Sequence, residues 1–266
     1  MTSKRKTTPG FIDIAQARVL ISNDDGIHAP GIKSLTRAVR KLAREVWVVA
    51  PETEQSATAH SLTLRRPLRI RKLGPRRFAV DGTPTDCVLL AINEIMKDSP
   101  PDIVLSGFNR GANLGDDVTY SGTIAAAIES VILGVPAVAL SQHYEDGQPV
   151  RWTTAEESLP GVLGKLKGHA LPTNSLLNVN FPDVPTPDIK DIQITTQGAR
   201  KLGDQIQAGS DPKGDPYYWI GSMRVAEKFH PGTDLHAVYG GSISITPLTT
   251  DLTDRRSIKA LRERIE

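Results

Sequence analysis

The chain has 266 residues, of which 39% are hydrophobic and 23% are charged, a composition typical of a globular protein with a sizeable core. Its 32 Lys and Arg nearly balance 30 Asp and Glu, and the net charge of +2 gives no sign of nucleic-acid or membrane binding. The single cysteine, Cys87, excludes an internal disulfide and a paired-cysteine metal site. Since no apolar run is long enough for a secretory signal or a membrane span, we expect a cytoplasmic protein.

The first half of the sequence alternates apolar runs with helix-period segments. Continuous apolar runs at 19–22, 46–50, 103–106 and 135–141 predict strands covered on both faces. Helices are predicted over 32–42, behind Pro30, and over 85–95 and 122–133. Strands that alternate with helices predict an α/β fold, a mostly parallel sheet with helices on both faces. In such a fold, ligands bind beyond the carboxyl ends of the strands.

After about residue 145 the pattern changes. Strands are predicted at 176–181, 192–196, 217–221 and 241–247, separated by segments rich in Gly, Pro and Asp, and a last helix is predicted over 254–264. We expect this region to be partly antiparallel with long β-hairpin arms. A two-stranded ribbon is only marginally stable alone, so such arms often pair with another subunit. The basic segment 65–77 is interpreted as another hairpin, with a solvated basic edge.

The stretch "RVLISNDDG" places two adjacent carboxylates, Asp24 and Asp25, at the end of the first predicted strand. Adjacent carboxylates repel each other unless a cation lies beside them, and oxygen ligands suit Mg²⁺, Mn²⁺ or Ca²⁺. The pattern therefore indicates a metal site. The alternative is a simple turn, because Asn, Asp and Gly are all turn-forming residues.

Polar residues at other strand ends favour the metal site. Ser56, Thr58 and His60 follow the second strand, and the segment "SGFNRGANLGDDVTYSGT" follows the strand at 103–106. This segment offers Asn109 and Asn113, and its Ser121-Gly122-Thr123 opens a predicted helix, whose free backbone N–H groups suit an anion. Carboxylates for a cation beside a helix start for an anion imply a phosphate substrate.

Five segments together identify a family. "SNDDGIHAPGI", "VVAPETEQSATAHSLTL", "GTPTDCV", "SGFNRGANLGDDVTYSGT" and "SITPLTTDLT" resemble the SurE family, metal-dependent 5′/3′-nucleotidases, in its order and spacing from about Arg18 to Thr253. The resemblance implies a metal-dependent phosphomonoesterase that hydrolyses nucleoside monophosphates, with short polyphosphate as a further candidate substrate. It also implies a Rossmann-like domain and a C-terminal part whose arms build dimers or tetramers.

The resemblance assigns roles residue by residue. Asp24, Asp25, Ser56 and Asn109 would be the ligands of a divalent cation, Mg²⁺ or Mn²⁺, and the two aspartates would be catalytic. Asn113, Ser121, Gly122 and Thr123 would bind the phosphate. The expected organisation is a flexible N-terminal extension at 1–17, a Rossmann-like catalytic core at 18–145, and a C-terminal part at 146–266 that completes the core and forms oligomerisation arms.

Several residues keep alternative interpretations. His60 is a structural residue or an acid for the leaving group. The "GTPTD" segment at 82–86 is a helix cap or part of the pocket lining. Asp116 and Asp117 are a rim loop or ligands. Tyr217, Tyr218 and Trp219 are an interface or core strand, or a platform for base stacking. A nucleotide-binding module and a nucleic-acid-binding protein remain as alternatives, although no G-x-G-x-x-G follows the first strand.

Overall fold

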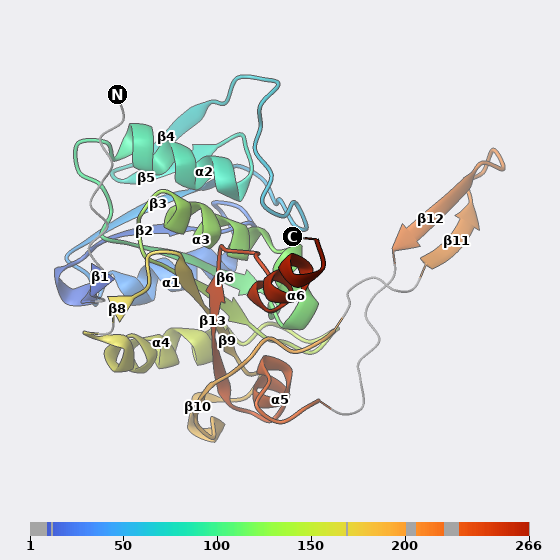
Figure 1. Ribbon diagram of the computed structural model, residues 1–266. Helices are drawn as coiled ribbons and strands as arrows, with labels where there is room; N and C mark the ends of the chain where they lie inside the picture. Colours follow the sequence, from blue (N-terminus) through green and yellow to red (C-terminus); the bar gives the residue numbers. More distant parts are fainter. Residues whose placement is uncertain (1–9, 12, 169, 201–205, 221–228, 266) are drawn as a thin grey trace.

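The structure, a computed structural model, describes residues 10–11, 13–168, 170–200, 206–220 and 229–265. Nine of its strands form one mixed sheet (Figure 1). In spatial order they are β10 (Ile192–Ile194), β13 (Ile243–Thr249), β9 (Ser175–Phe181), β7 (Ala137–Gln142), β6 (Ile103–Arg110), β2 (Arg18–Ser22), β3 (Glu45–Pro51), β5 (Arg77–Val80) and β4 (Ile70–Gly74). The pairs β13–β9 and β5–β4 are antiparallel and the others are parallel. The predicted α/β fold is confirmed.

Helices cover both faces of this sheet because the strands are apolar on both faces. Val19 and Ile21 of β2 point to one side, where they pack with α1 (Pro30–Val39) and α4 (Trp152–Leu166). Leu20, between them, packs on the other side with α2 (Pro84–Leu90) and α3 (Gly122–Ile132). Burial that alternates in this way is the period-two geometry of a strand.

The elements expected in the first half are present, with some differences in their ends. The α-helical part of the segment predicted over 85–95 stops at Leu90, and a π-helical segment, η2 (Ala91–Ile95), completes it. The basic hairpin is formed by β4 and β5, so it begins and ends later than the charge pattern suggested. Ile14 of η1 (Ile14–Gln16) and Ala17 are buried in the core. The packed structure therefore begins before residue 18.

The chain beyond residue 145 extends the same sheet. β9 lies parallel to β7, and β13 then lies antiparallel to β9, so the predicted partly antiparallel character is confirmed. α4 and α5 (Asp234–Tyr239) were missed by the sequence analysis. Two further strands, β1 (Gly10–Phe11) and β8 (Ala170–Leu171), pair with each other. Among the described helices, none combines the length and apolar character needed to cross a bilayer.

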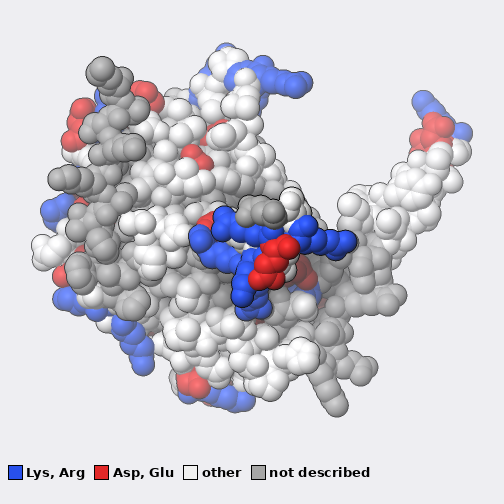
Figure 2. All heavy atoms as spheres, viewed as in Figure 1, with Lys and Arg blue, Asp and Glu red and all other residues white. Residues whose placement is uncertain are grey.

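A hairpin and the last helix stand on the surface. β11 (Ile206–Ser210) and β12 (Pro216–Ile220) form an antiparallel two-stranded ribbon that projects from the body in Figure 1. It corresponds to one predicted arm, although Gly221 at the end of the predicted strand lies outside the described residues. No residue of α6 (Arg255–Ile265) is buried, and its charged side chains are prominent on the face shown in Figure 2.

Candidate metal and phosphate site

The carboxyl ends of three neighbouring strands meet at one cleft. β6, β2 and β3 are adjacent and parallel, and residues at or just after their carboxyl ends line a cleft of about 310 Å³. Asp24, Ser56, Asn109, Asn113 and Ser121 all contribute to its lining. The predicted convergence of these strand ends is therefore confirmed.

Asp24 lines the cleft, and Asp25, the next residue in the chain, has a different environment. Asp24 is only 5% exposed, and its Oδ1 accepts a hydrogen bond of 2.5 Å from Thr123 Oγ1. Asp25 Oδ2 accepts a hydrogen bond of 3.0 Å from the Arg110 backbone N–H. Burial raises the pKa of Asp24, and burial together with the charge of Asp24 raises the pKa of Asp25 to about 6. Two carboxylates held in this way repel each other, and a cation would relieve that repulsion.

The neutral ligand candidates present oxygen atoms. Asn109 uses Nδ2 to donate to Gly111 O at 2.8 Å, which leaves Oδ1 as an oxygen donor for a cation. Ser56 Oγ donates to Glu54 Oε1 at 2.8 Å and keeps lone pairs for a ligand. Within the described residues, no group of three His, Cys, Asp or Glu side chains could hold a metal. Two carboxylates with neutral oxygens fit a hard divalent cation that keeps water or substrate oxygens in its coordination sphere.

α3 begins beside the carboxylates. Ser121 caps this helix, because its Oγ accepts a hydrogen bond of 3.1 Å from the Ile124 N–H. The N–H groups of Gly122 and Thr123, in the first turn, have no acceptor within the helix and suit an anion. A Cβ atom on Gly122 would lie 2.7 Å from Asp24 Cβ, so glycine allows the helix to approach Asp24 this closely. The Thr123 hydroxyl is already used by Asp24, which leaves only its backbone for a phosphate.

Asn113 is fixed by side chains from the second half of the sheet. Its N–H donates to Asn180 Oδ1 at 2.8 Å, and its carbonyl accepts from Asn178 Nδ2 at 2.8 Å. The side-chain Nδ2 donates to Ser141 Oγ at 2.8 Å. Three hydrogen-bonding groups of Asn113 are thus engaged. Its side chain can still offer Oδ1 and the second hydrogen of Nδ2 to a ligand. No sequence pattern linked it to the two asparagines of β9.

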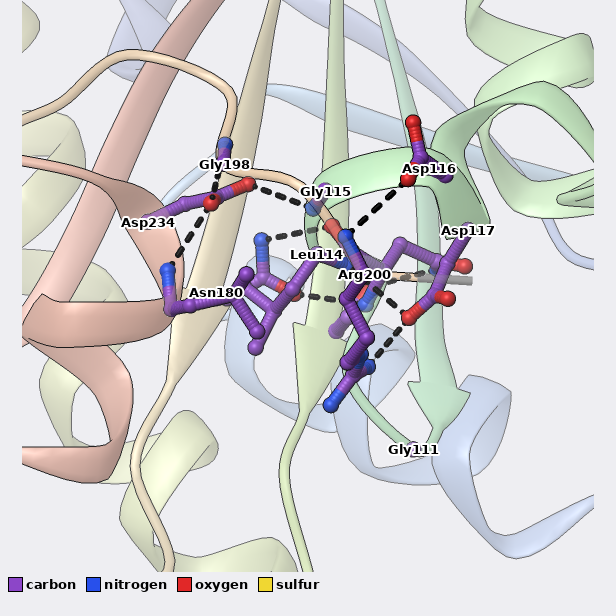
Figure 3. A network of polar contacts seen from close by, with 12 residues as sticks. Gly111, Leu114, Gly115, Asp116, Asp117, Asn180, Gly198, Arg200 and Asp234 are labelled. Atoms are coloured by element: carbon purple, nitrogen blue, oxygen red, sulfur yellow. Dashed lines mark hydrogen bonds and ion pairs between the residues drawn. The ribbon is translucent and has the colours of Figure 1, made fainter. Parts of the chain in front are cut away.

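The outer wall of the cleft contains residues that the sequence analysis did not single out. The Arg200 guanidinium donates to the Asp117 carboxylate in a buried ion pair (Figure 3). Arg110 lies over the Tyr144 ring, 5.3 Å from its centroid. Arg200 is 83 positions from Asp117, and only the fold brings the two together. Asp117 had been expected as a rim residue or a ligand; its carboxylate is instead committed to Arg200.

The remaining candidates have structural partners. His60 Nε2 lies 2.9 Å from Glu129 Oε2, which agrees with the structural interpretation of this histidine. Cys87 is buried in the core between the sheet and α2. The side chain and backbone of Thr83 form a capping box with Asp86 at the start of α2, which supports the helix-cap reading of 82–86.

Comparisons with known proteins agree with this site. A sequence profile of the family described as Survival protein SurE matches residues 19–204. This chain belongs to the SurE family. A relative named 5′-nucleotidase SurE from Paramagnetospirillum magneticum is 58% identical and covers 96% of this chain and 98% of its own length. One with the same name from Parvibaculum lavamentivorans is 51% identical, covering 92% and 90%.

The SurE fold is also shown by a solved structure. The SurE protein from Aquifex aeolicus superposes with a TM-score of 0.83 at 38% identity, covering 94% of this chain and all of that one. The family resemblance stated from the five sequence segments is therefore confirmed over nearly the whole chain.

Proposed function

We propose that this SurE protein is a divalent-metal-dependent phosphatase that hydrolyses nucleoside monophosphates to nucleosides and phosphate. The observation that carries the proposal is the position of Asp24, the neighbour of Asp25 in the chain, directly beside the start of α3: a candidate cation site lies next to a candidate anion site. The names of its relatives, 5′-nucleotidase SurE, support the substrate class. Both 5′ and 3′ monophosphates belong to that class, and short polyphosphate is a further candidate.

Asp24, Asp25, Ser56 and Asn109 would hold the cation, Mg²⁺ or Mn²⁺. The cation would supply Lewis-acid polarisation of the phosphoryl group and neutralise charge in the transition state. Thr123 orients Asp24, and the Arg110 N–H orients Asp25, so both carboxylates are placed before a ligand arrives. This preorganisation avoids rearrangement during the reaction.

The phosphate would be bound by the opposite wall of the cleft. The proposed contacts are the Asn113 Nδ2 hydrogen that is not donated to Ser141, the Ser121 hydroxyl, and the N–H groups of Gly122 and Thr123. The helix N-terminus favours the negative charge of the phosphate. The attacking group is either water or an Asp carboxylate. If the carboxylate attacks, the ester P–O bond breaks, the nucleoside leaves and an aspartyl phosphate forms, which borohydride reduces to homoserine; direct attack by water forms no such intermediate.

The proposal is tested by phosphate release from a panel of 5′ and 3′ nucleoside monophosphates and short polyphosphate. We expect release in Mg²⁺ or Mn²⁺ and its loss in EDTA, with recovery when the metal is restored. A folded protein that releases no phosphate with any divalent metal would overturn the proposal.

The titration of Asp25 predicts how metal binding depends on pH. Its pKa of about 6 is raised above the usual value, so protonation of this group favours the metal-free fold, and that contribution is lost as pH rises through about 6. A cation competes with this proton. We therefore expect the increase in melting temperature caused by Mn²⁺ to grow from pH 5 to 7, with apparent affinity rising about tenfold per pH unit below pH 6. An increase that is constant across this range would contradict the assignment.

We propose that the chain forms a homodimer or homotetramer through its hairpin arm. Trp219 of β12 is 68% exposed, and Tyr218 and Ile220 beside it are also exposed. An isolated two-stranded ribbon is only marginally stable, and an exposed apolar patch on it suits contact with another subunit. In the part of the chain that the structure describes, α6 also has no buried residue. We place the protein in the cytoplasm, since its single cysteine offers no internal disulfide, and we propose neither nucleic acid nor membrane as a partner.

Replacement of Trp219 by Ser is expected to shift the protein to a smaller assembly in analytical ultracentrifugation, because the exposed indole would be lost from the interface. The matched control is Leu64→Ser, which removes an even more exposed apolar side chain, 84% exposed, outside the arm. An unchanged sedimentation coefficient for Trp219→Ser would argue against assembly through the arm.

A further inference from the structure

The loop 113–117, which forms one wall of the cleft, is held almost entirely by the C-terminal part of the chain. The Gly115 N–H donates to Asp234 Oδ2 at 2.9 Å, and Gln197 Nε2 donates to Gly115 O at 2.9 Å. The Arg200 backbone binds Asp116 twice: Asp116 N–H donates to Arg200 O at 3.2 Å, and Arg200 N–H donates to the Asp116 side-chain Oδ2 at 3.0 Å. Figure 3 shows the contacts of Gly115 with Asp234 and of Asp116 with Arg200.

Arg200 adds the only buried ion pair at this wall among the described residues. Its side chain is 4% exposed and that of Asp117 is 3% exposed. Arg200 Nη1 also donates to the Tyr239 hydroxyl at 2.8 Å. Arg200 Nε and Asp117 Oδ1 are buried without a hydrogen-bond partner in the described chain. A buried ion pair whose hydrogen-bonding groups are not all used contributes little to the stability of the fold. We therefore look for a role of this pair in the cleft.

The pair is connected directly to the proposed phosphate contacts. The Asp117 carbonyl accepts hydrogen bonds from the N–H groups of Tyr120 at 3.0 Å and Ser121 at 3.1 Å. Ser121 is the cap of α3, so the position of Asp117 sets where the first turn of that helix begins. Asp117 and Arg200 both line the same cleft as Asp24 and Asn109.

We propose that Arg200 is a positioning residue for phosphate binding: its side chain holds Asp117 and thereby fixes the loop that carries Asn113 and the start of α3. The inference rests on the proposed function, since it assigns a task within that site. Arg200 acts through these residues and makes no contact with the carboxylates of Asp24 or Asp25. Its loss therefore weakens the phosphate side and leaves the cation side intact.

The test compares wild type with Arg200→Ala at a temperature where both are folded. We expect KM for a nucleoside monophosphate, and Ki for inorganic phosphate, to rise about tenfold or more, while kcat changes less. The Kd for Mn²⁺, measured by calorimetry without substrate, is expected to stay within about threefold. Guanidinium ion at concentrations far below those that denature should lower KM of the variant, and Arg200→Lys, which keeps the charge without the planar fork, should be intermediate.

Two further variants keep the result interpretable if Arg200→Ala does not fold. Tyr239→Phe removes one hydrogen bond from the guanidinium and should raise KM and Ki by a smaller factor. Arg18→Ala is the matched control, because Arg18 pairs with Glu45 (Nε to Oε2, 3.3 Å) at the opposite end of β2. It should lower the melting temperature without changing KM.

The inference is overturned if KM and phosphate Ki of folded Arg200→Ala or Arg200→Lys equal those of wild type. It is also overturned if guanidinium has no effect and Mn²⁺ affinity falls together with phosphate affinity, which would mean general loosening of the site. Failure of the proposed function is recognised separately, because wild type itself would then release no phosphate.

Discussion

Asp25→Asn is expected to lower metal-dependent phosphate release by at least about 100-fold, since loss of a residue that merely orients a metal ligand already costs about 10- to 100-fold. The change removes one negative charge but keeps an oxygen that can accept the Arg110 N–H at the same place. The cation would lose a carboxylate while the fold keeps its contacts. The measurement is kcat/KM for one nucleoside monophosphate at saturating Mn²⁺.

The same substitution should make the metal-free protein more stable near neutral pH. It replaces a carboxylate that is partly desolvated and lies beside Asp24 with a neutral amide. A higher melting temperature in EDTA, together with lost activity, would identify Asp25 as a residue kept for function. Activity within a few-fold of wild type would exclude Asp25 as a cation ligand.

Gly122→Ala is expected to cost about 100-fold in kcat/KM, because a shift of about 1 Å at a reacting centre can have that effect. The added Cβ would lie 2.7 Å from Asp24 Cβ and 2.9 Å from Asp24 Oδ2, so either Asp24 or the start of α3 must move. Overpacking of this kind also destabilises a protein by about 1–3 kcal/mol. Kinetics and urea denaturation measure the two effects separately.

Gly161→Ala is the matched control for this substitution. Gly161 also lies in a helix, α4, but nothing lies within 4 Å of a Cβ placed there. Alanine should stabilise that helix by about 0.5–1 kcal/mol with no change in activity. Equal behaviour of the two variants would show that the close approach of Gly122 to Asp24 has no functional consequence.

The sheet and its main helices were predictable from sequence because their signals are local. The run at 19–22 is apolar throughout, and the helix over 30–39 repeats its apolar residues at helical spacing. α4 was missed because Pro160, Gly161 and Gly164 lie within it and mark a break in any pattern-based prediction. α5 has only six residues, too few to show a period.

In the site, too, the residues next to regular elements were predictable and the residues from irregular segments were not. Asp24, Asp25, Asn109 and Ser121 each follow a predictable strand or open a predictable helix, so their convergence could be expected from parallel topology. Arg200 and Asp234 come from irregular or short segments far along the chain, and long-range hydrogen bonds join them to the loop 113–117. Thr123 was placed correctly at the start of a helix, but its hydroxyl partner, Asp24, could not be known without the fold.

The loop 113–117 is anchored by residues as distant as Asp234. This affects when, during synthesis, the two sides of the site can form. A ribosome that has released β2, β3 and β6 has already exposed Asp24, Asp25 and Asn109, yet the wall opposite them still lacks Asn180, Arg200 and Asp234. Contacts of such large sequence separation form late and slow folding. A nascent chain can therefore hold the residues proposed to bind a cation well before it has the wall proposed to hold a phosphate, so hydrolysis should begin only after nearly the whole sequence has been translated.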